Sequence, residues 1–545
     1  MPKDVIAEGL ASGKWDVRDA AQFMRDQTLE ADVLIVGTGA GGGVAAEILS
    51  QAGLKVVMLE EGGLNFASRD FKLKEANAYP QLYQESAGRQ TKDKAITILQ
   101  GRTVGGSTTV NWTSSFRTPP TTLQHWQQHY GLADMTVAAM APWFGKAEQR
   151  LNVIDWQVES NMNNRVLAQG ADRIGIHWSK IRRNVNGCLN LGYCGMGCPV
   201  NAKQSMLVTT IPSALQQGAT LLTHVRAERV LVEGERAVGV AGVAMDSGGL
   251  YPNGVRITVK AKTVLLAGGA INTPALMLRS ELPDPYARIG KRTFLHPVNI
   301  SGAIMPFKVE GWQGAPQSIY SDHFLDTLPV DGPIGYKLEV PPLHPVLTAI
   351  TMSGFGEKHR SLMARFDRLQ VILALLRDGF HESSQGGTVG LKSDGTPQLD
   401  YPISDYVWSG LRHAYLTMAE LQFAAGANRV MPIHEDVSAE GYASWAEARA
   451  GIQSLPLEAL RAKIVSAHVM GGAGMSTQPQ DGVVNSEGRF HQLDGLYVMD
   501  GSVFPTSIGA NPQLSIYGLV ARNASLLAAS LTGKQPDWPL MPKMQ

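Results

Sequence analysis

The first clear pattern along the chain is an apolar run, a glycine-rich turn, a helix-like stretch and a second apolar run. Asp32–Val36 and Lys55–Leu59 have the β-type composition of short buried strands, whereas Val44–Gln51 has that of a helix. The glycines of 37–42 lie between the first strand and the helix. This order predicts one βαβ unit, in which the two strands are parallel neighbours.

Further along, the pattern changes several times. Alternation of apolar and polar residues over 221–245 predicts antiparallel strands, and 262–270 predicts a buried strand that ends in glycines. The spacing over 17–28 and over 362–376 predicts helices, and Pro512–Leu531 predicts a long closing helix. The pattern of buried strands and helices therefore recurs near the C-terminus, after a middle region with a different pattern.

We expect an α/β fold (α+β overall) with a Rossmann-like nucleotide-binding domain built from discontinuous segments and an inserted substrate domain. No internal repeat of about 20–50 residues is visible. The predicted division is an N-terminal extension (1–30), the nucleotide-binding domain (31–160, 200–300 and 465–545), a cysteine-bearing segment (161–199) and the substrate-binding domain (301–464).

Composition narrows the class of partner. The 545 residues carry 48 basic and 48 acidic side chains, and this balance argues against nucleic acid, which binds to a clustered basic face. We find no apolar run long enough for a transmembrane span and no signal peptide in the charged first thirty residues. We therefore expect a cytoplasmic protein or one peripheral on the inner membrane, and a periplasmic one only if a signal-bearing partner exports it.

The glycine turn carries the pattern Gly37-x-Gly39-x-x-Gly42 between a strand and a helix, and Glu60 ends the next strand. In this pattern the first glycine makes the turn and the second lets the backbone approach a pyrophosphate. The third allows close packing of helix and strand, and the acid holds ribose hydroxyls. The motif predicts a dinucleotide site, but it leaves FAD and NAD open.

Four blocks carry a family resemblance: GTGAGGG with LEEGG, GRTVGGSTTVN (101–111), LLAGGAINTPALMLRS (265–280), and the run from SAHVMGGAGM to GANPQLSIYGL near the C-terminus. They resemble the glucose–methanol–choline (GMC) flavoprotein oxidoreductases. The KQSM element (203–206) looks most like the long-chain alcohol oxidase and dehydrogenase branch. The resemblance implies FAD, an alcohol substrate and a substrate domain on an antiparallel β-sheet.

The resemblance also implies roles for single residues. The expected cofactor-binding residues are Gly37, Gly39, Gly42, Glu60, Gly105, Gly106, Ser107, Asn111, Ala227, Asp500, Gly501 and Pro512. Some relatives attach FAD covalently through a histidine where this chain has Val110, so we expect non-covalent FAD.

Alcohol oxidation needs a proton acceptor beside the flavin, and imidazole suits that task near neutral pH. By position His468 matches the family's catalytic base, and Asn511 matches a second position whose amide could donate to the substrate oxygen. We expect His296 to be structural, and His224 and His491 to be surface or packing residues.

All three cysteines fall in one short segment, Cys188-x5-Cys194-x3-Cys198-Pro199. One interpretation is a three-iron iron–sulfur cluster, because thiolates are its usual ligands and the spacing looks like that of cluster-bearing bacterial glucose and fructose dehydrogenases. A disulfide with one free thiol, or three structural thiols, stay open as alternatives, whereas zinc would lack a fourth ligand.

Together these features predict an FAD-dependent dehydrogenase that converts primary alcohols, of medium to long aliphatic chain, to aldehydes. The apolar residues of 347–356 and 362–376 favour such a substrate, although they would equally form a domain core or a membrane-facing surface. We expect electrons to pass to a quinone, a cytochrome or a small accessory subunit. The alternatives are an oxidase that uses O2, a sugar or polyol dehydrogenase with an iron–sulfur relay, and a non-redox hydroxynitrile lyase.

Overall fold

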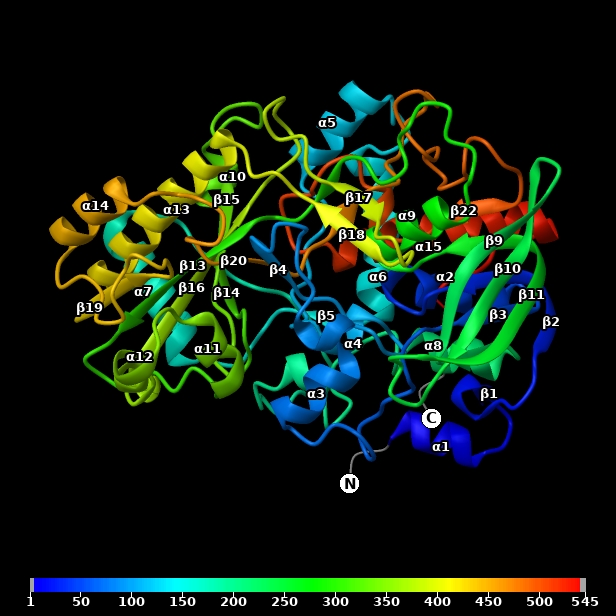
Figure 1. Cartoon of the computed structure of the whole chain (residues 1–545), viewed down its shortest axis with the longest axis horizontal. Helices are drawn as coiled ribbons and strands as arrows, with labels where there is room; N and C mark the ends of the chain where they lie inside the picture. Colours follow the sequence, from blue (N-terminus) through cyan, green and yellow to red (C-terminus); the bar gives the residue numbers. More distant parts are fainter. Residues whose placement is uncertain (1–3, 540–545) are drawn as a thin grey trace.

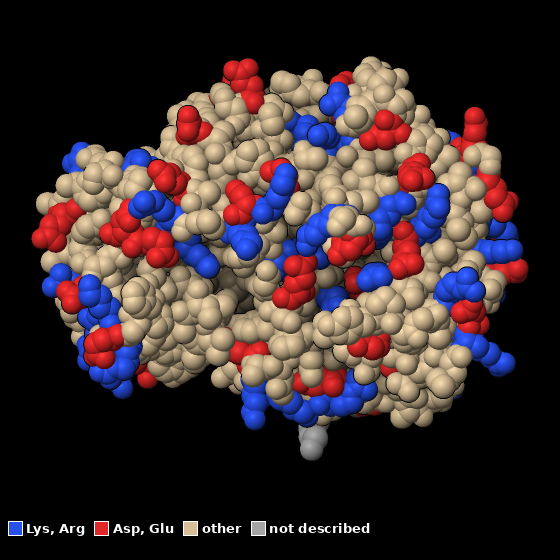
Figure 2. Space-filling model, viewed as in Figure 1, with Lys and Arg blue, Asp and Glu red and all other residues tan. Residues whose placement is uncertain are grey.

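A computed structural model describes residues 4–539 of the chain. Two lobes lie side by side in Figure 1, each built on its own β-sheet. Figure 2 shows acidic and basic side chains interspersed over the visible face, with a hollow where the two lobes meet.

The first sheet has the order β1-β8-β3-β2-β11-β10-β9, and β22 pairs with β11. The central strands β3, β2 and β11 are parallel, whereas β11, β10 and β9 form an antiparallel meander. The parallel part contains the predicted βαβ unit, and the meander contains the predicted antiparallel strands. Its strands are β1 (Asp16–Asp19), β2 (Gln27–Val36), β3 (Val56–Leu59), β8 (Thr220–Thr223), β9 (Val225–Glu233), β10 (Arg236–Met245), β11 (Pro252–Leu266) and β22 (Leu496–Val498).

Helices cover the first sheet because their apolar faces need a partner. Helix α2 (Ala40–Gln51) packs between α15 (Gln513–Thr532) and α8 (Thr210–Gln216), and α6 (Val137–Arg150) packs on α15. By length and hydropathy α15 alone among the described helices could cross a membrane, but 72% of its apolar window is buried in the protein. We interpret α15 as a core helix, in agreement with the predicted closing helix.

The second sheet has the order β4-β20-β13-β16-β15-β14-β6, and β19 pairs with β13. It is antiparallel apart from the β4–β20 pair. The long helix α13 (Asp405–Ala424) packs on one face with α7 (Met162–Ile174) and α14 (Trp445–Ser454) (Figure 1). Its strands are β4 (Ile96–Ile98), β6 (Ser179–Lys180), β13 (Val298–Ile304), β14 (Ile319–Ser321), β15 (Tyr336–Glu339), β16 (Leu369–Leu376), β19 (Arg429–Pro432) and β20 (Ile464–Ser466).

Two of the predicted helices are wrong. Residues 17–28 form most of β1, a short 3-10 turn and the beginning of β2, so this part of the predicted N-terminal extension adds backbone to the first sheet. Residues 369–376 form strand β16, which is buried along its whole length, and only the part before it contains the short helix α12 (Gly356–Met363). A continuous apolar run does not distinguish a buried helix from a central strand, and here pairing with β13 and β15 decided the outcome.

Candidate active site

A cavity of about 910 Å³ runs between the two sheets. On one side it is lined at the carboxyl ends of three parallel strands, by Val36, Leu59 and Leu266, where ligands bind in open α/β sheets. On the other side it is lined by residues of β13, β16 and β20. The cavity therefore joins a nucleotide-binding edge to the face of an antiparallel sheet.

The glycine turn lies at the nucleotide-binding edge, where Gly37 and Gly39 line the cavity. Gly37 has a φ of +98°, which favours glycine, and Gly39 is the N-cap of α2, so free backbone N–H groups face the cavity. Gly42 lies behind the wall, where a Cβ atom would come within 1.9 Å of the Gly37 carbonyl oxygen. Gly37 and Gly42 thus have no room for a side chain, whereas Gly39 has open space beside it, which leaves room for a pyrophosphate.

Glu60 reaches the same edge from the end of β3 and lines the cavity. Its Oε2 accepts from the N–H of Thr38 at 3.1 Å and from its hydroxyl at 2.6 Å, and its Oε1 accepts from the N–H of Gly62 at 2.9 Å. Burial raises the pKa of this carboxyl, and the three donors oppose that rise. Glu60 thus holds the two turns together, with acceptor capacity left for ribose hydroxyls.

The second glycine block faces the first across a narrow gap. A Cβ atom on Gly106 would lie 2.8 Å from the Cα of Gly39, so only glycine lets the two turns approach. Ser107 and Asn111 also line the cavity, and Asn111 donates to the amide oxygen of Gln513 at 2.6 Å. Gly105 lies behind the wall and donates its N–H to Thr38.

Three further predicted residues line the cavity, Ala227, Asp500 and Gly501. The carbonyl of Ala227 accepts from Arg279 at 3.0 Å. The Asp500 carboxylate accepts from the N–H groups of Gly269 and Ser502, both at 2.8 Å, and burial raises its pKa. Asp500 therefore positions the turns that border the cavity. Together with the glycine turns and their backbone N–H groups, these residues form a site that fits a dinucleotide.

His468 lies in the loop after β20, is half-buried and lines the cavity. Its Nδ1 lies 3.3 Å from Nδ1 of His296, whose Nε2 accepts the N–H of Gly509 at 3.1 Å. Within residues 4–539 no group hydrogen-bonds to Nε2 of His468. Burial and the neighbouring Lys337 lower the pKa of His468 to about 4. The predicted structural histidine is thus a direct neighbour of the predicted base.

Asn511 and Pro512 line the cavity just before α15. The amide Nδ2 of Asn511 donates to Oε2 of Glu339 at 3.1 Å, and Nε2 of Gln317 donates to the same oxygen at 2.5 Å. Both Oδ1 of Asn511 and Oε1 of Glu339 are buried without a partner among the described residues. The structure therefore brings Asn511 to the same cavity as His468.

Sequence reasoning missed Glu339, Lys337 and Gln317. Glu339 and Lys337 are two residues apart on β15, so both project from one face of the second sheet. Burial raises the pKa of Glu339 to about 7 and lowers that of Lys337 to about 8. One signal could have revealed Lys337 and Glu339, a pair of charged residues in the otherwise apolar segment GYKLEV, but it does not extend to Gln317.

Beside these polar groups the cavity wall is apolar, because Glu339 and Lys337 pair with Leu373 and Leu375 of the neighbouring strand β16. Val298, Val465, Leu373 and Leu375 contribute to it from three neighbouring strands of the second sheet. Leu373 and Leu375 point to one face of β16 because side chains alternate along a strand. The apolar segment that the sequence associated with the substrate thus reaches the cavity, as a strand.

The three cysteines are free thiols in a loop around the short turn 194–196, so no disulfide is present in this described segment. Backbone N–H groups point at two sulfurs, Asn190 to Cys188 at 3.4 Å and Ala202 to Cys198 at 3.2 Å. The guanidinium of Arg183 lies 3.7 Å from the sulfur of Cys194. The three sulfurs do not all lie within 4.8 Å of one another.

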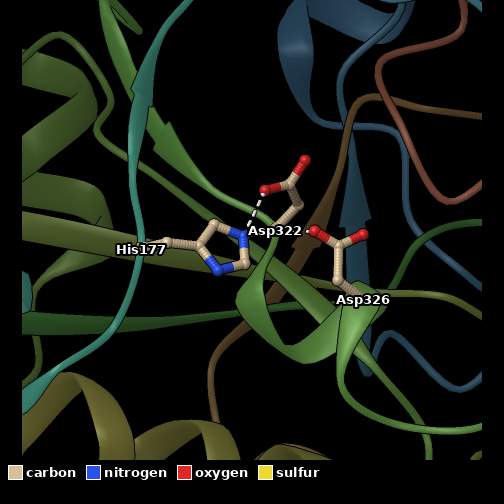
Figure 3. Close-up of side chains that lie close together, drawn as sticks. All are labelled: His177, Asp322 and Asp326. Atoms are coloured by element: carbon tan, nitrogen blue, oxygen red, sulfur yellow. Dashed lines mark hydrogen bonds and ion pairs between the residues drawn. The ribbon is translucent and has the colours of Figure 1, made fainter.

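A separate polar group lies outside the cavity lining, at the edge of the second sheet. Figure 3 shows the imidazole of His177 pointing between the carboxylates of Asp322 and Asp326, with Nε2 3.0 and 3.1 Å from the nearest oxygens. Asp326 is on the short helix α10 (His323–Asp326), and its side chain is 62% exposed. We interpret this group as a surface ion-pair cluster that fastens α10 to the segment before β6.

Comparison with known proteins supports the interpretation of the cavity. Models of the N- and C-terminal parts of GMC oxidoreductases match residues 79–298 and 383–519. A long-chain-alcohol oxidase of Arabidopsis thaliana is 29% identical over 93% of this chain and 68% of its own. An uncharacterized GMC-type oxidoreductase of Mycobacterium tuberculosis is 30% identical over 92% of this chain and 76% of its own.

Solved structures show the same fold. Formate oxidase of Aspergillus oryzae superposes with a TM-score of 0.68 at 14% identity, over 93% of this chain and 99% of its own. A pyridoxine 4-oxidase superposes with a TM-score of 0.63 at 17% identity, over 90% and 98% of the two chains. These findings support FAD as the dinucleotide and an oxidoreductase that acts on CH–OH donors. The chain therefore belongs to the GMC oxidoreductase family.

Proposed function

We propose that this protein oxidises primary aliphatic alcohols of medium to long chain to aldehydes, with His468 and Asn511 at the hydroxyl group. The observation that carries the proposal is a single cavity that joins a glycine-lined nucleotide edge, one polar pair and an apolar wall. Bound FAD supplies the acceptor for the hydride that leaves the carbinol carbon. The apolar wall excludes water from the reacting centre, and His468 and Asn511 orient the hydroxyl.

Two observations support an alcohol of medium to long chain as the substrate. Leu373, Leu375, Val298 and Val465 present aliphatic surface to the substrate side of the cavity, and the named plant relatives are long-chain-alcohol oxidases. The test is the rate of flavin bleaching under anaerobic conditions with ethanol, octanol, dodecanol and glucose. We expect octanol or dodecanol to be fastest. A preference for glucose would reject the substrate, and absence of bleaching with every compound would reject the reaction.

We propose further that electrons leave to a quinone, a cytochrome or an accessory subunit through a three-iron cluster held by Cys188, Cys194 and Cys198. Two buried cations beside these thiols, Arg183 and Lys203, form no ion pair with a carboxylate among the described residues. Unpaired buried cations are costly, and thiolates or an anionic cluster would compensate them. Lys203 also links the two sites, because its Nζ donates to the carbonyls of Asn111 and Cys194.

Iron and acid-labile sulfide, assayed on protein purified without oxygen, test the cluster. We expect both to be near stoichiometric in the wild type and lost in Cys194→Ser. Substoichiometric iron would reject the cluster and leave structural thiols. An oxygen electrode, with and without an artificial acceptor, separates the dehydrogenase from an oxidase, which the names of the plant relatives favour.

We also propose peripheral contact with a membrane, on its cytoplasmic face or, after export with a partner, on the periplasmic one. Its support is an exposed apolar surface on the second lobe, where Val346, Ile350 and Phe355 are 49, 67 and 91% exposed around α11 (Pro345–Thr351). Sedimentation with phosphatidylglycerol vesicles tests this contact. Equal binding by wild type and a Phe355→Ser variant would remove the surface from the proposal.

A further inference from the structure

Glu339 and Asn511 meet in a buried place, and the hydrogen bond between them uses only one polar atom of each group. Nδ2 of Asn511 donates to Oε2 of Glu339 at 3.1 Å, and Nε2 of Gln317 donates to the same oxygen at 2.5 Å. Oε1 of Glu339 and Oδ1 of Asn511 are both buried without a partner among the described residues. The carboxyl group therefore has one oxygen with two donors and one oxygen with none.

This asymmetry does not suit a carboxylate, which carries charge on both oxygens and needs donors at both. Glu339 is fully buried, and no cation of residues 4–539 forms an ion pair with it. The ammonium of Lys337, on the same strand, lies over the ring of Phe116, 3.5 Å from its centroid. An unpaired buried charge is costly, and such groups usually take up a proton instead. A neutral carboxyl group has one acceptor oxygen and one hydroxyl, which matches the two oxygens of Glu339.

The amide of Asn511 supplies the acceptor that such a hydroxyl needs. Amide and carboxyl groups are both planar, and here they already meet at Nδ2 and Oε2. Oδ1 shares its carbon with Nδ2, and Oε1 shares its carbon with Oε2, so a second hydrogen bond between these oxygens closes a ring. That one bond gives a partner to each of the two buried oxygens that lack one.

We propose that Glu339 is a neutral carboxylic acid in the resting enzyme, and that its Oε1–H donates to Oδ1 of Asn511. The acid and the amide then form a cyclic pair with two hydrogen bonds, which prevents the amide from turning over. Because Oδ1 faces Glu339, Asn511 offers the cavity the hydrogen of Nδ2 that lies outside the ring, a donor for the substrate oxygen. Glu339 is thus a positioning residue that acts through Asn511, and this inference rests on the proposed function.

The groups around Glu339 agree with a neutral acid. Burial raises the pKa of Glu339 to about 7, although Lys337 and Asn511 oppose the rise. Its partners on the neighbouring strands are Tyr320 on β14, a phenol whose pKa burial raises, and the apolar Leu373 on β16. Glu339 is therefore protonated below neutral pH. Deprotonation at higher pH removes the Oε1–H and leaves two acceptor oxygens against each other, so alcohol oxidation should slow above neutral pH.

Infrared spectroscopy of the substrate-free holoenzyme tests the proton directly. Subtracting the spectrum of Glu339→Gln from that of the wild type, both at about pH 5.5, isolates this carboxyl group from other buried acids. We expect the C=O stretch of a neutral, hydrogen-bonded carboxylic acid. The bands of a carboxylate in its place would overturn the proposal, whatever the activity. This readout does not depend on turnover, so it separates failure of this inference from failure of the proposed function, which anaerobic bleaching of the wild type decides.

Matched variants test the positioning role in the holoenzyme. Glu339→Gln keeps an acceptor oxygen and replaces the O–H donor by N–H, so the ring survives, and we expect flavin reduction within about 3-fold of wild type. The slowing above neutral pH should vanish in this variant. Glu339→Leu removes both hydrogen bonds, and we expect kcat to fall roughly 100-fold with little change in KM. Equal loss in the two variants, or an unchanged pH profile in Glu339→Gln, would overturn the proposal.

Discussion

The glycine turn and the group around Asn511 line the same cavity but are built from different parts of the chain. The turn is one continuous segment whose backbone forms the wall, and Gly37 and Gly42 have their roles because neighbouring atoms leave no space. The polar groups join side chains that are far apart in the sequence: Glu339 binds Gln317 and Asn511, and His296 lies against His468. The shape of the glycine turn is thus set by the local sequence. The hydrogen-bonded group forms only when the two lobes pack together.

The largest effect is expected when the packing of the glycine turn is disrupted. In Gly42→Ala the new Cβ would meet the Gly37 carbonyl at 1.9 Å, and backbone cannot move aside as a side chain can. We expect a loss of about 3 kcal/mol or more in unfolding free energy and no bound flavin. Chemical denaturation and the flavin-to-protein absorbance ratio measure both.

The matched control is Gly39→Ala, where the nearest atom would lie 3.9 Å from the new Cβ. We expect stability within about 0.5 kcal/mol of wild type and weaker flavin binding. Equal destabilisation by the two variants would contradict the packing argument for Gly42.

The next test breaks the link between the flavin segment and the cysteines. Lys203 donates to the carbonyls of Thr109, Asn111 and Cys194, at 2.6 to 2.8 Å. In Lys203→Met these three carbonyls lose their donor, and we expect a loss of about 2–3 kcal/mol, measured by denaturant unfolding. A variant as stable as the wild type would show that the buried cation costs as much as its hydrogen bonds contribute.

A smaller effect, on the pH dependence of stability, distinguishes His468 from Glu339. His468 has a pKa of about 4 in the folded protein against 6.5 ordinarily, so the unfolded chain binds more protons and stability falls as the pH drops from 6.5 to 4. Glu339, at about 7 against 4.5, has the opposite sign and gains stability as the pH falls from 7 to 4.5. His468→Gln should therefore reduce the loss of Tm between about pH 7.5 and about pH 5, and Glu339→Gln should increase it, each by roughly 1–3 °C. Shifts of the same sign would contradict the assignment.

The smallest effect is expected outside the cavity. Asp326→Asn removes one carboxylate of the exposed cluster around His177, and exposed ion pairs contribute about 0.5 kcal/mol or less. We expect unchanged alcohol turnover and a shift in denaturation midpoint close to the error of measurement. A large loss of activity would show that this surface group is coupled to the cavity.

The sequence by itself determined the local features: the βαβ unit, the glycine turn with Glu60, the cysteine segment and the closing helix. Each depends on short-range periodicity or on spacing within one segment, which the chain shows directly. It also placed His468 and Asn511, through the family resemblance. By contrast, tertiary structure alone decided that 369–376 is a strand, because pairing partners choose between helix and strand for an apolar run. It also decided the contacts of His296 with His468 and Gly509 and of Glu339 with Asn511, since these partners lie between 172 and 213 positions away along the chain.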